Sequence, residues 1–70
     1  MKDFRAIISE LKSFLARDRD IKVRDKDVAL LLGMTQARFA TIKKRNVTPY
    51  EEILLLCERE DLSVKRIFFD

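Results

Sequence analysis

Residues 27–45, DVALLLGMTQARFATIKKR, constrain the fold most, because their pattern predicts two short helices joined by a tight turn. The apolar side chains of the first helix share one face, at Val28, Leu31 and Leu32. Gly33 follows them, and glycine commonly adopts the left-handed conformation with which a helix ends. The Thr35 hydroxyl can then cap a second helix over 36–45, which contains no glycine, proline or acidic residue.

The predicted helix at 36–45 has two unlike faces. Phe39 and Ile42 lie three residues apart, so we expect both to pack inward. The opposite face carries small and polar side chains: Gln36, Ala37, Ala40, Thr41 and Lys44. Amide, hydroxyl and methyl groups can meet base edges in a DNA major groove, and cations can meet phosphates.

Two helices joined by a short turn containing glycine form the helix-turn-helix pattern, in which the second helix reads DNA. We therefore predict sequence-specific binding of double-stranded DNA. The predicted base-reading residues are Gln36, Ala37, Arg38, Ala40 and Thr41. The predicted contacts to the DNA backbone are Lys26, Lys43, Lys44, Arg45 and Asn46.

The position of the charges supports this prediction more than their sum does. The net charge of +3 only weakly favours a polyanionic partner. Residues 28–50 contain four basic residues and no acidic one, whereas 51–61 contain one basic and five acidic residues. The acid-free window includes the predicted reading helix, and we expect the acidic segment to face away from phosphate.

The composition argues against several other functions. With no histidine and one cysteine, the chain offers neither a zinc site nor an internal disulfide. We expect no catalysis, cofactor or small-molecule substrate, because there is no glycine-rich phosphate loop and no carboxylate pair in a predicted cleft. No apolar run is long enough to cross a bilayer, so we expect no membrane partner. The single cysteine fits a reducing, cytoplasmic setting, in a bacterium or associated with a nucleoid.

The whole chain is expected to form one compact all-α domain, since it contains a single glycine and a single proline. The five predicted helices span about 3–17, 25–32, 36–45, 49–60 and 64–68. Besides Thr35, the expected capping residues are Asp3, Asp25, Ser63, and Thr48 in a capping box with Glu51. Pro49 is expected at the first helical position, and Asn46 at a position with positive φ.

Apolar stripes predict which helix faces are buried. The first helix has the clearest stripe: Phe4, Ile7, Ile8, Leu11, Phe14 and Leu15. The fourth has a wide one: Tyr50, Ile53, Leu54, Leu56 and Cys57. Leu55 extends that run, which suggests burial on more than one side of the helix. The charged residues 17–20 are expected at a solvated helix end, and 18–24 in a loop with Ile21 or Val23 inward.

The C-terminal end offers an alternative function. We expect three residues of this end to face inward, Val64, Ile67 and Phe68. Phe69 then has no position in the core. Such an end suggests a dimer contact made by Ile67, Phe68 and Phe69. Alternatively, the chain is a small helical protein–protein interaction module that docks through the Phe68/Phe69 end. The small side chains of 36–45 argue against a docking face on that helix, which would need larger apolar anchors.

Three segments in this order, VALLLGMTQARFATIKKRN, VTPYEEILLLCERED and LSVKRIFF, resemble a known family. Together they are similar to the N-terminal DNA-binding domain of phage CI-type repressors, in the lambda-repressor-like helix-turn-helix superfamily. The resemblance covers about residues 25–70. It implies a compact five-helix domain, of phage or prophage origin, that binds operator DNA as a homodimer and represses transcription.

The resemblance also implies roles for single residues. Gln36 matches a glutamine that can pair with adenine, Ala37 and Thr41 fall at base-contacting positions, and Lys44 falls near the DNA backbone. The chain departs from the family pattern at Ile42, where tryptophan is common, and at Asn46, where glycine is common. A polar residue that touches phosphate in the family falls on Asp25, for which Lys26 is the substitute.

Overall fold

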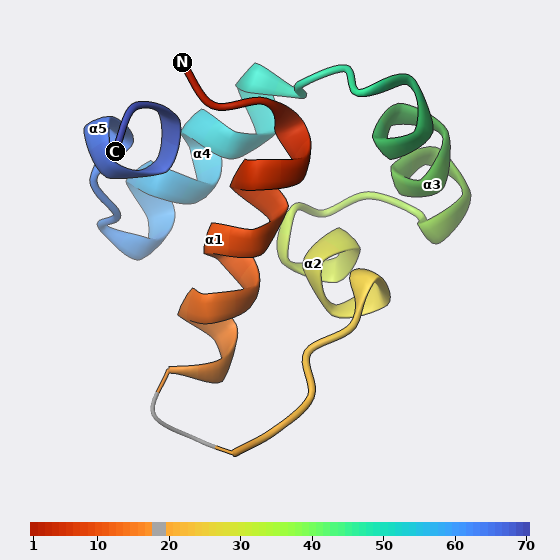
Figure 1. The fold of residues 1–70 in the computed structure, drawn as a ribbon, viewed down its shortest axis with the longest axis horizontal. Coiled ribbons are helices and arrows are strands. Elements are labelled where there is room, and N and C mark those ends of the chain that lie inside the picture. The colour runs from red at the N-terminus through yellow and green to blue at the C-terminus, as the bar shows by residue number, and fades with distance from the viewer. Residues whose placement is uncertain (18–19) are drawn as a thin grey trace.

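The computed structural model describes residues 1–17 and 20–70, which form five helices and no strand (Figure 1). The helices are α1 (Phe4–Ala16), α2 (Asp25–Leu31), α3 (Gln36–Arg45), α4 (Tyr50–Glu60) and α5 (Val64–Phe68). The predicted all-α class is confirmed, and the predicted helix ends lie within one residue of the observed ends. Part of the charged run and of the loop predicted at 18–24 lies outside the described residues.

In Figure 1 α1 occupies the middle of the molecule, with α2 and α3 on one side and α5 on the other. The chain ends meet beside α5, where the Lys2 amide donates to the Phe68 carbonyl at 2.7 Å. No helix among residues 1–17 and 20–70 is long and apolar enough to span a bilayer.

Most helix ends form as local sequence chemistry predicts. The side chains of Asp3, Thr35 and Ser63 each accept a hydrogen bond from the backbone amide three residues later, at 2.9, 3.1 and 3.2 Å. Gly33 and Asn46 both have positive φ, at 71° and 53°, and they follow α2 and α3. These caps satisfy amides and carbonyls that a helix leaves unpaired at its ends.

The expected cap at Asp25 is wrong. The N-cap of α2 is Arg24, whose backbone amide donates to Asp27 Oδ2 at 2.9 Å. Asp25 is the first helical residue, and its carboxylate forms ion pairs with lysines of two other helices. The Asp25 carboxylate is therefore engaged in tertiary pairs, and Asp27 is the acid that accepts a hydrogen bond from the backbone at the N-terminus of α2.

The expected capping box of α4 is also wrong. Pro49 is the N-cap rather than the first helical residue, and no side chain caps this helix. The Tyr50 amide donates to the Thr48 carbonyl at 3.0 Å, so a tight turn precedes the helix and shifts its start to Tyr50. Glu52, the third helical residue, pairs with Arg38 of α3.

The hydrophobic core lies between α1 and the other four helices. It consists of Phe4, Ile7, Ile8, Leu11, Val28, Ala29, Leu32, Phe39, Ile53, Leu56, Cys57, Ile67 and Phe68. Leu15 and Val23 pack against it partly buried, as does Ile42. Burial raises the pKa of the Cys57 thiol, which keeps the thiol neutral in an apolar packing position.

Several apolar residues that were expected to be buried are exposed. Tyr50 is 47% exposed, Leu54 45%, Leu55 56% and Val64 42%. The buried residues of α4 are confined to one stripe, Ile53, Leu56 and Cys57, and the apolar positions beside that stripe remain at the surface. The Tyr50 ring still stacks on Phe68, with ring centroids 5.7 Å apart. In the loop after α1, Val23 is the inward residue and Ile21 is half exposed.

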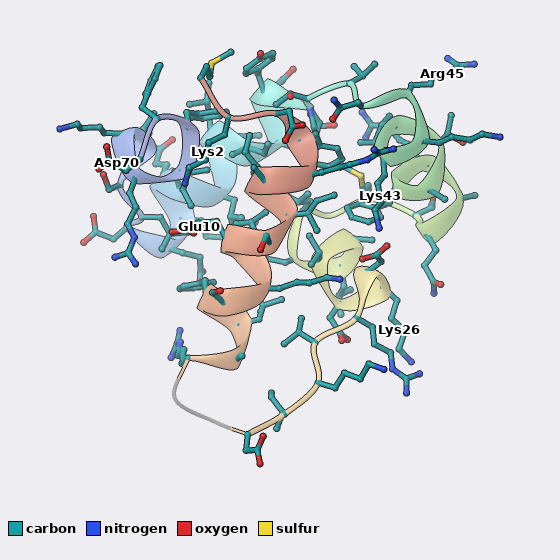
Figure 2. The ribbon with its side chains drawn as sticks, viewed as in Figure 1. Lys2, Glu10, Lys26, Lys43, Arg45 and Asp70 are labelled. Carbon is teal, nitrogen blue, oxygen red and sulfur yellow. The ribbon has the colours of Figure 1, made fainter. Side chains whose placement is uncertain are left out.

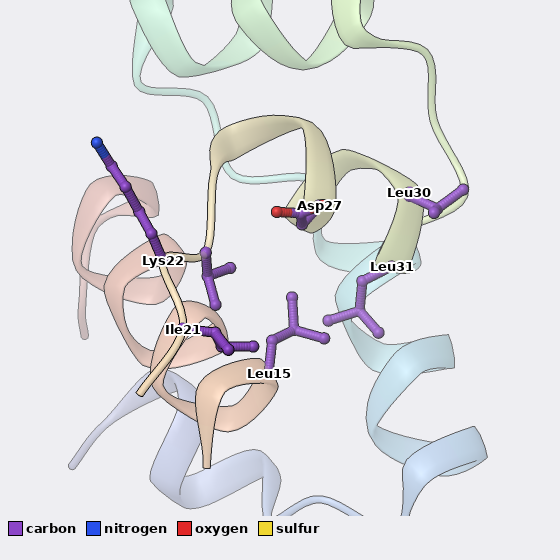
Figure 3. Close-up of a pocket in the computed structure, with 7 residues that line it drawn as sticks. Leu15, Ile21, Lys22, Asp27, Leu30 and Leu31 are labelled. Carbon is purple, nitrogen blue, oxygen red and sulfur yellow. The ribbon is translucent and has the colours of Figure 1, made fainter. Parts of the chain in front are cut away.

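An apolar groove of about 390 Å³ opens between the end of α1, the following loop and α2 (Figure 3). Leu15, Ile21 and Leu31 form much of its wall, with Lys22 and Asp27 also lining it. The Asp27 carboxylate already accepts a hydrogen bond from the Arg24 backbone amide. The described lining comes from α1, α2 and the loop, so the groove includes no residue of α3.

Candidate nucleic-acid interface

One face of α3 is exposed and free of acidic side chains. We call it the outer face; it consists of Gln36, Ala37, Ala40, Thr41 and Lys44, all exposed. On the other side of the helix Phe39 is 2% exposed, and Ile42 packs partly buried against the core. The two-faced character predicted from the sequence is therefore present, with the apolar side anchored in the core.

Contacts with α2 and α4 fix the orientation of this helix. The Met34 amide donates to the Ala29 carbonyl at 3.0 Å, which closes the turn between α2 and α3. Ala29 is 1% exposed, and its small side chain lets the two helices approach each other. The Arg59 guanidinium of α4 donates to the Leu31 carbonyl at 2.8 Å and so holds the end of α2. The outer face is thus presented by a rigid arrangement rather than by a loop.

One flank of α3 is tied to α1 and α2 through Asp25. Lys43 Nζ lies 2.6 Å from Asp25 Oδ2, and Lys12 Nζ lies 2.8 Å from Asp25 Oδ1. Hydrogen bonds from Lys12 and Lys43 lower the pKa of the Asp25 carboxyl. Figure 2 shows Lys43 between α2 and α3. Lys43, predicted to contact DNA phosphate, already has an acidic partner in the free protein.

The other flank is tied to α4. Arg38 Nη2 lies 2.5 Å from Glu52 Oε2, and the two side chains are 54% and 22% exposed. The hydrogen bond from Arg38 is the largest cause that lowers the pKa of the Glu52 carboxyl. Arg38, predicted to read bases, is therefore also paired within the protein.

These pairs change the charge that α3 presents. Of the four cations in the acid-free window 28–50, Arg38 pairs with Glu52, and Lys43 pairs with Asp25, whose single negative charge it shares with Lys12. Lys44 and Arg45 are exposed, as is Lys26 on α2, and none of them has an acidic partner among the described residues. Figure 2 shows Lys26 and Arg45 extending outward from the ribbon.

Glu52 was not predicted to be part of this surface. It lies in the acidic segment expected to face away from phosphate, and its partner is fourteen positions earlier in the chain. Only the path of residues 46–49 brings the first turn of α4 next to the first turn of α3. A pattern of helix faces cannot predict that path.

Two further predicted residues have defined local roles. The Thr41 hydroxyl donates to the Ala37 carbonyl at 3.0 Å, so its lone pairs and its methyl group remain for an external partner. Asn46 is exposed and ends α3 in the left-handed conformation. Of the predicted dimer contacts, Ile67 and Phe68 are each 4% exposed and belong to the core, whereas Phe69 is 62% exposed.

The chain has no match among protein-family models, curated proteins or solved structures.

The lowered pKa values of Asp25 and Glu52 predict a loss of stability in acid. Folding lowers both pKa values, so these carboxylates stabilise the fold fully at a pH above the ordinary carboxyl pKa of about 4. That stabilisation is lost as the pH falls through the lowered folded-state values. We expect the midpoint of thermal unfolding, followed by circular dichroism, to fall between pH 6 and pH 3.

The double variant Asp25→Asn/Glu52→Gln serves as the reference for this effect. It cannot titrate at these two positions, so its unfolding midpoint should fall less over the same pH range. An equal fall in both proteins would show that other carboxyl groups cause the acid sensitivity.

Proposed function

We propose that the protein binds double-stranded DNA sequence-specifically, with the outer face of α3 in the major groove. The proposal rests on the character of this face. Its side chains are small or polar, they are exposed, and none is acidic, while Phe39 on the opposite side of α3 is buried in the core. A major groove admits an α-helix, and small side chains let the helix approach the base edges closely.

The outer-face residues then take separate roles. Gln36, in the first turn of α3, can form a bidentate pair with adenine. Ala37 and Ala40 can contact thymine methyl groups, and Thr41 offers an acceptor and a methyl group. Lys44 lies on the same face, near its C-terminal end. Together with Lys26, Arg45 and the end of α3 at Asn46, it supplies the contacts to phosphate.

The proposed biological role is transcriptional repression in the cytoplasm. It follows from the resemblance to phage CI-type repressors: two copies on inverted half-sites would occupy an operator and block RNA polymerase. The exposed Phe69 is the residue we assign to contact between the two copies. The alternative role, a protein-docking module at the Phe68/Phe69 end, has less support because Phe68 is buried.

Selection of bound duplexes from a randomised DNA pool, at near-physiological salt, tests the proposed function. We expect two inverted half-sites whose centres are about 34–36 Å apart, one turn of the double helix. A single half-site would support DNA reading by one copy and would contradict the dimer. Recovery of no preferred sequence would contradict sequence-specific binding.

Gln36→Ala is expected to relax the choice of base at one position of the selected site. Losing a bidentate pair with a base costs about 1–3 kcal/mol of discrimination. Fluorescence anisotropy should therefore show weaker binding to the selected duplex and little change for duplexes altered at that base pair. Unchanged discrimination at every position would show that Gln36 does not read DNA. Lys44→Ala is the comparison, since it should weaken binding to all duplexes alike.

A further inference from the structure

The Arg38–Glu52 pair stands at the edge of the proposed DNA-binding face. Both residues are the third of their helices, so the pair joins the first turns of α3 and α4. The Glu52 side chain is 22% exposed and the Arg38 side chain is 54% exposed. A charged hydrogen bond of 2.5 Å therefore fixes a cation that would otherwise be free to approach phosphate.

We propose that Glu52 neutralises Arg38 and thereby keeps the protein's affinity for DNA of arbitrary sequence low. The proposal rests on the proposed DNA-binding function and adds a residue that does not itself face bases. Contacts to phosphate carry no sequence information, so every additional free cation strengthens binding to all duplexes alike. A regulator has to find its site among a large excess of other sequences, and such binding competes with that search.

The arrangement of neighbouring charges supports a masking role. Glu52 has Arg38 as its ion-pair partner, and the exposed cations Lys44 and Arg45 have no acidic partner among the described residues. Moving Arg38 to a phosphate would break the pair and leave the Glu52 carboxylate without its cation. Three cations, Lys26, Lys44 and Arg45, then remain for phosphate. For three contacts, log K should fall with log salt at a slope of about −2.7.

The first variant is Glu52→Gln, which removes the charge and keeps the size of the side chain. We expect its affinity for a random-sequence duplex to rise about fivefold at 0.15 M salt, with a salt slope steeper by about 0.9, equivalent to one added phosphate contact. Glu51→Gln is the matched control. It removes the same charge from the same turn of α4, and Glu51 is exposed with no ion-pair partner among the described residues.

The double variant Arg38→Gln/Glu52→Gln completes the design. We expect its affinity for the random-sequence duplex to return to about the wild-type value, because the cation that Glu52→Gln exposes is no longer present. Circular dichroism melts accompany each variant, and the ion pair is exposed enough that all of them should fold. An equal gain in Glu51→Gln would overturn the proposal, since the cause would then be net charge. A fall in affinity on Glu52→Gln would overturn it as well.

The test separates this proposal from the proposed function. If wild-type protein binds the selected duplex but Glu52→Gln behaves like Glu51→Gln, only the role of Glu52 fails. If wild-type protein binds no duplex even at low salt, the DNA-binding function fails and the role of Glu52 fails with it.

Discussion

Phe39→Ala is expected to unfold much of the protein at room temperature. Phe39 is the fully buried residue of α3, and its ring meets Phe4 edge to face with centroids 5.7 Å apart. Replacing a buried phenylalanine by alanine costs about 3–5 kcal/mol. A single domain of this size has a total stability of about the same magnitude. Urea titration followed by circular dichroism should show loss of most of the pretransition baseline.

Phe69→Ala is the matched control for that substitution. Phe69 is 62% exposed, so the same change of residue should shift the free energy of unfolding by less than about 0.5 kcal/mol. Equal destabilisation by the two variants would contradict the assignment of Phe39 to the core and of Phe69 to the surface. A stable Phe39→Ala variant would mean that α3 is held by other contacts.

Ala40→Glu is expected to abolish DNA binding while leaving the fold intact. Ala40 is exposed near the middle of the outer face, so a glutamate there would meet phosphates and base acceptors. Like-charge contacts at an interface cost several kcal/mol, which corresponds to a loss of affinity on the order of a hundredfold or more. Glutamate is a good helix former, and the helix should persist. Anisotropy with the selected duplex measures the loss, and a melt checks the fold.

Ala6→Glu provides the same change of charge at a distant place. Ala6 is exposed in the first turn of α1, where an acidic side chain is favourable to the helix. We expect its DNA affinity to fall only by the small effect of net charge. If both variants lost affinity equally, binding would depend on overall charge and not on the outer face of α3.

Helix ends were largely predictable because their chemistry is local. Asp3, Thr35 and Ser63 each bond an amide three residues away, so a short window of sequence contains both partners. Asp25 could not be predicted in the same way. Its role depends on Lys12 and Lys43, which lie far along the chain and approach it only in the folded protein.

The extent of burial was less predictable than the position of the helices. Periodicity identifies the apolar side of α4, but how wide a stripe of it is covered depends on how the helices pack. Tyr50 and Leu54 are exposed beside the buried stripe of Ile53, Leu56 and Cys57, although their spacing matches a core face. The exposed and buried sides of α3 were predicted, whereas the acidic partners of Arg38 and Lys43 were not.

Amide chemical-shift mapping of the labelled protein with its selected duplex tests the central claim most directly. We expect the largest shifts in α3, between Gln36 and Arg45, and at Lys26 in the first turn of α2. Amides of the middle of α1 should change little, since that helix lies in the interior. Shifts concentrated around Phe69 and the exposed side of α4, with α3 unaffected, would contradict DNA reading by α3.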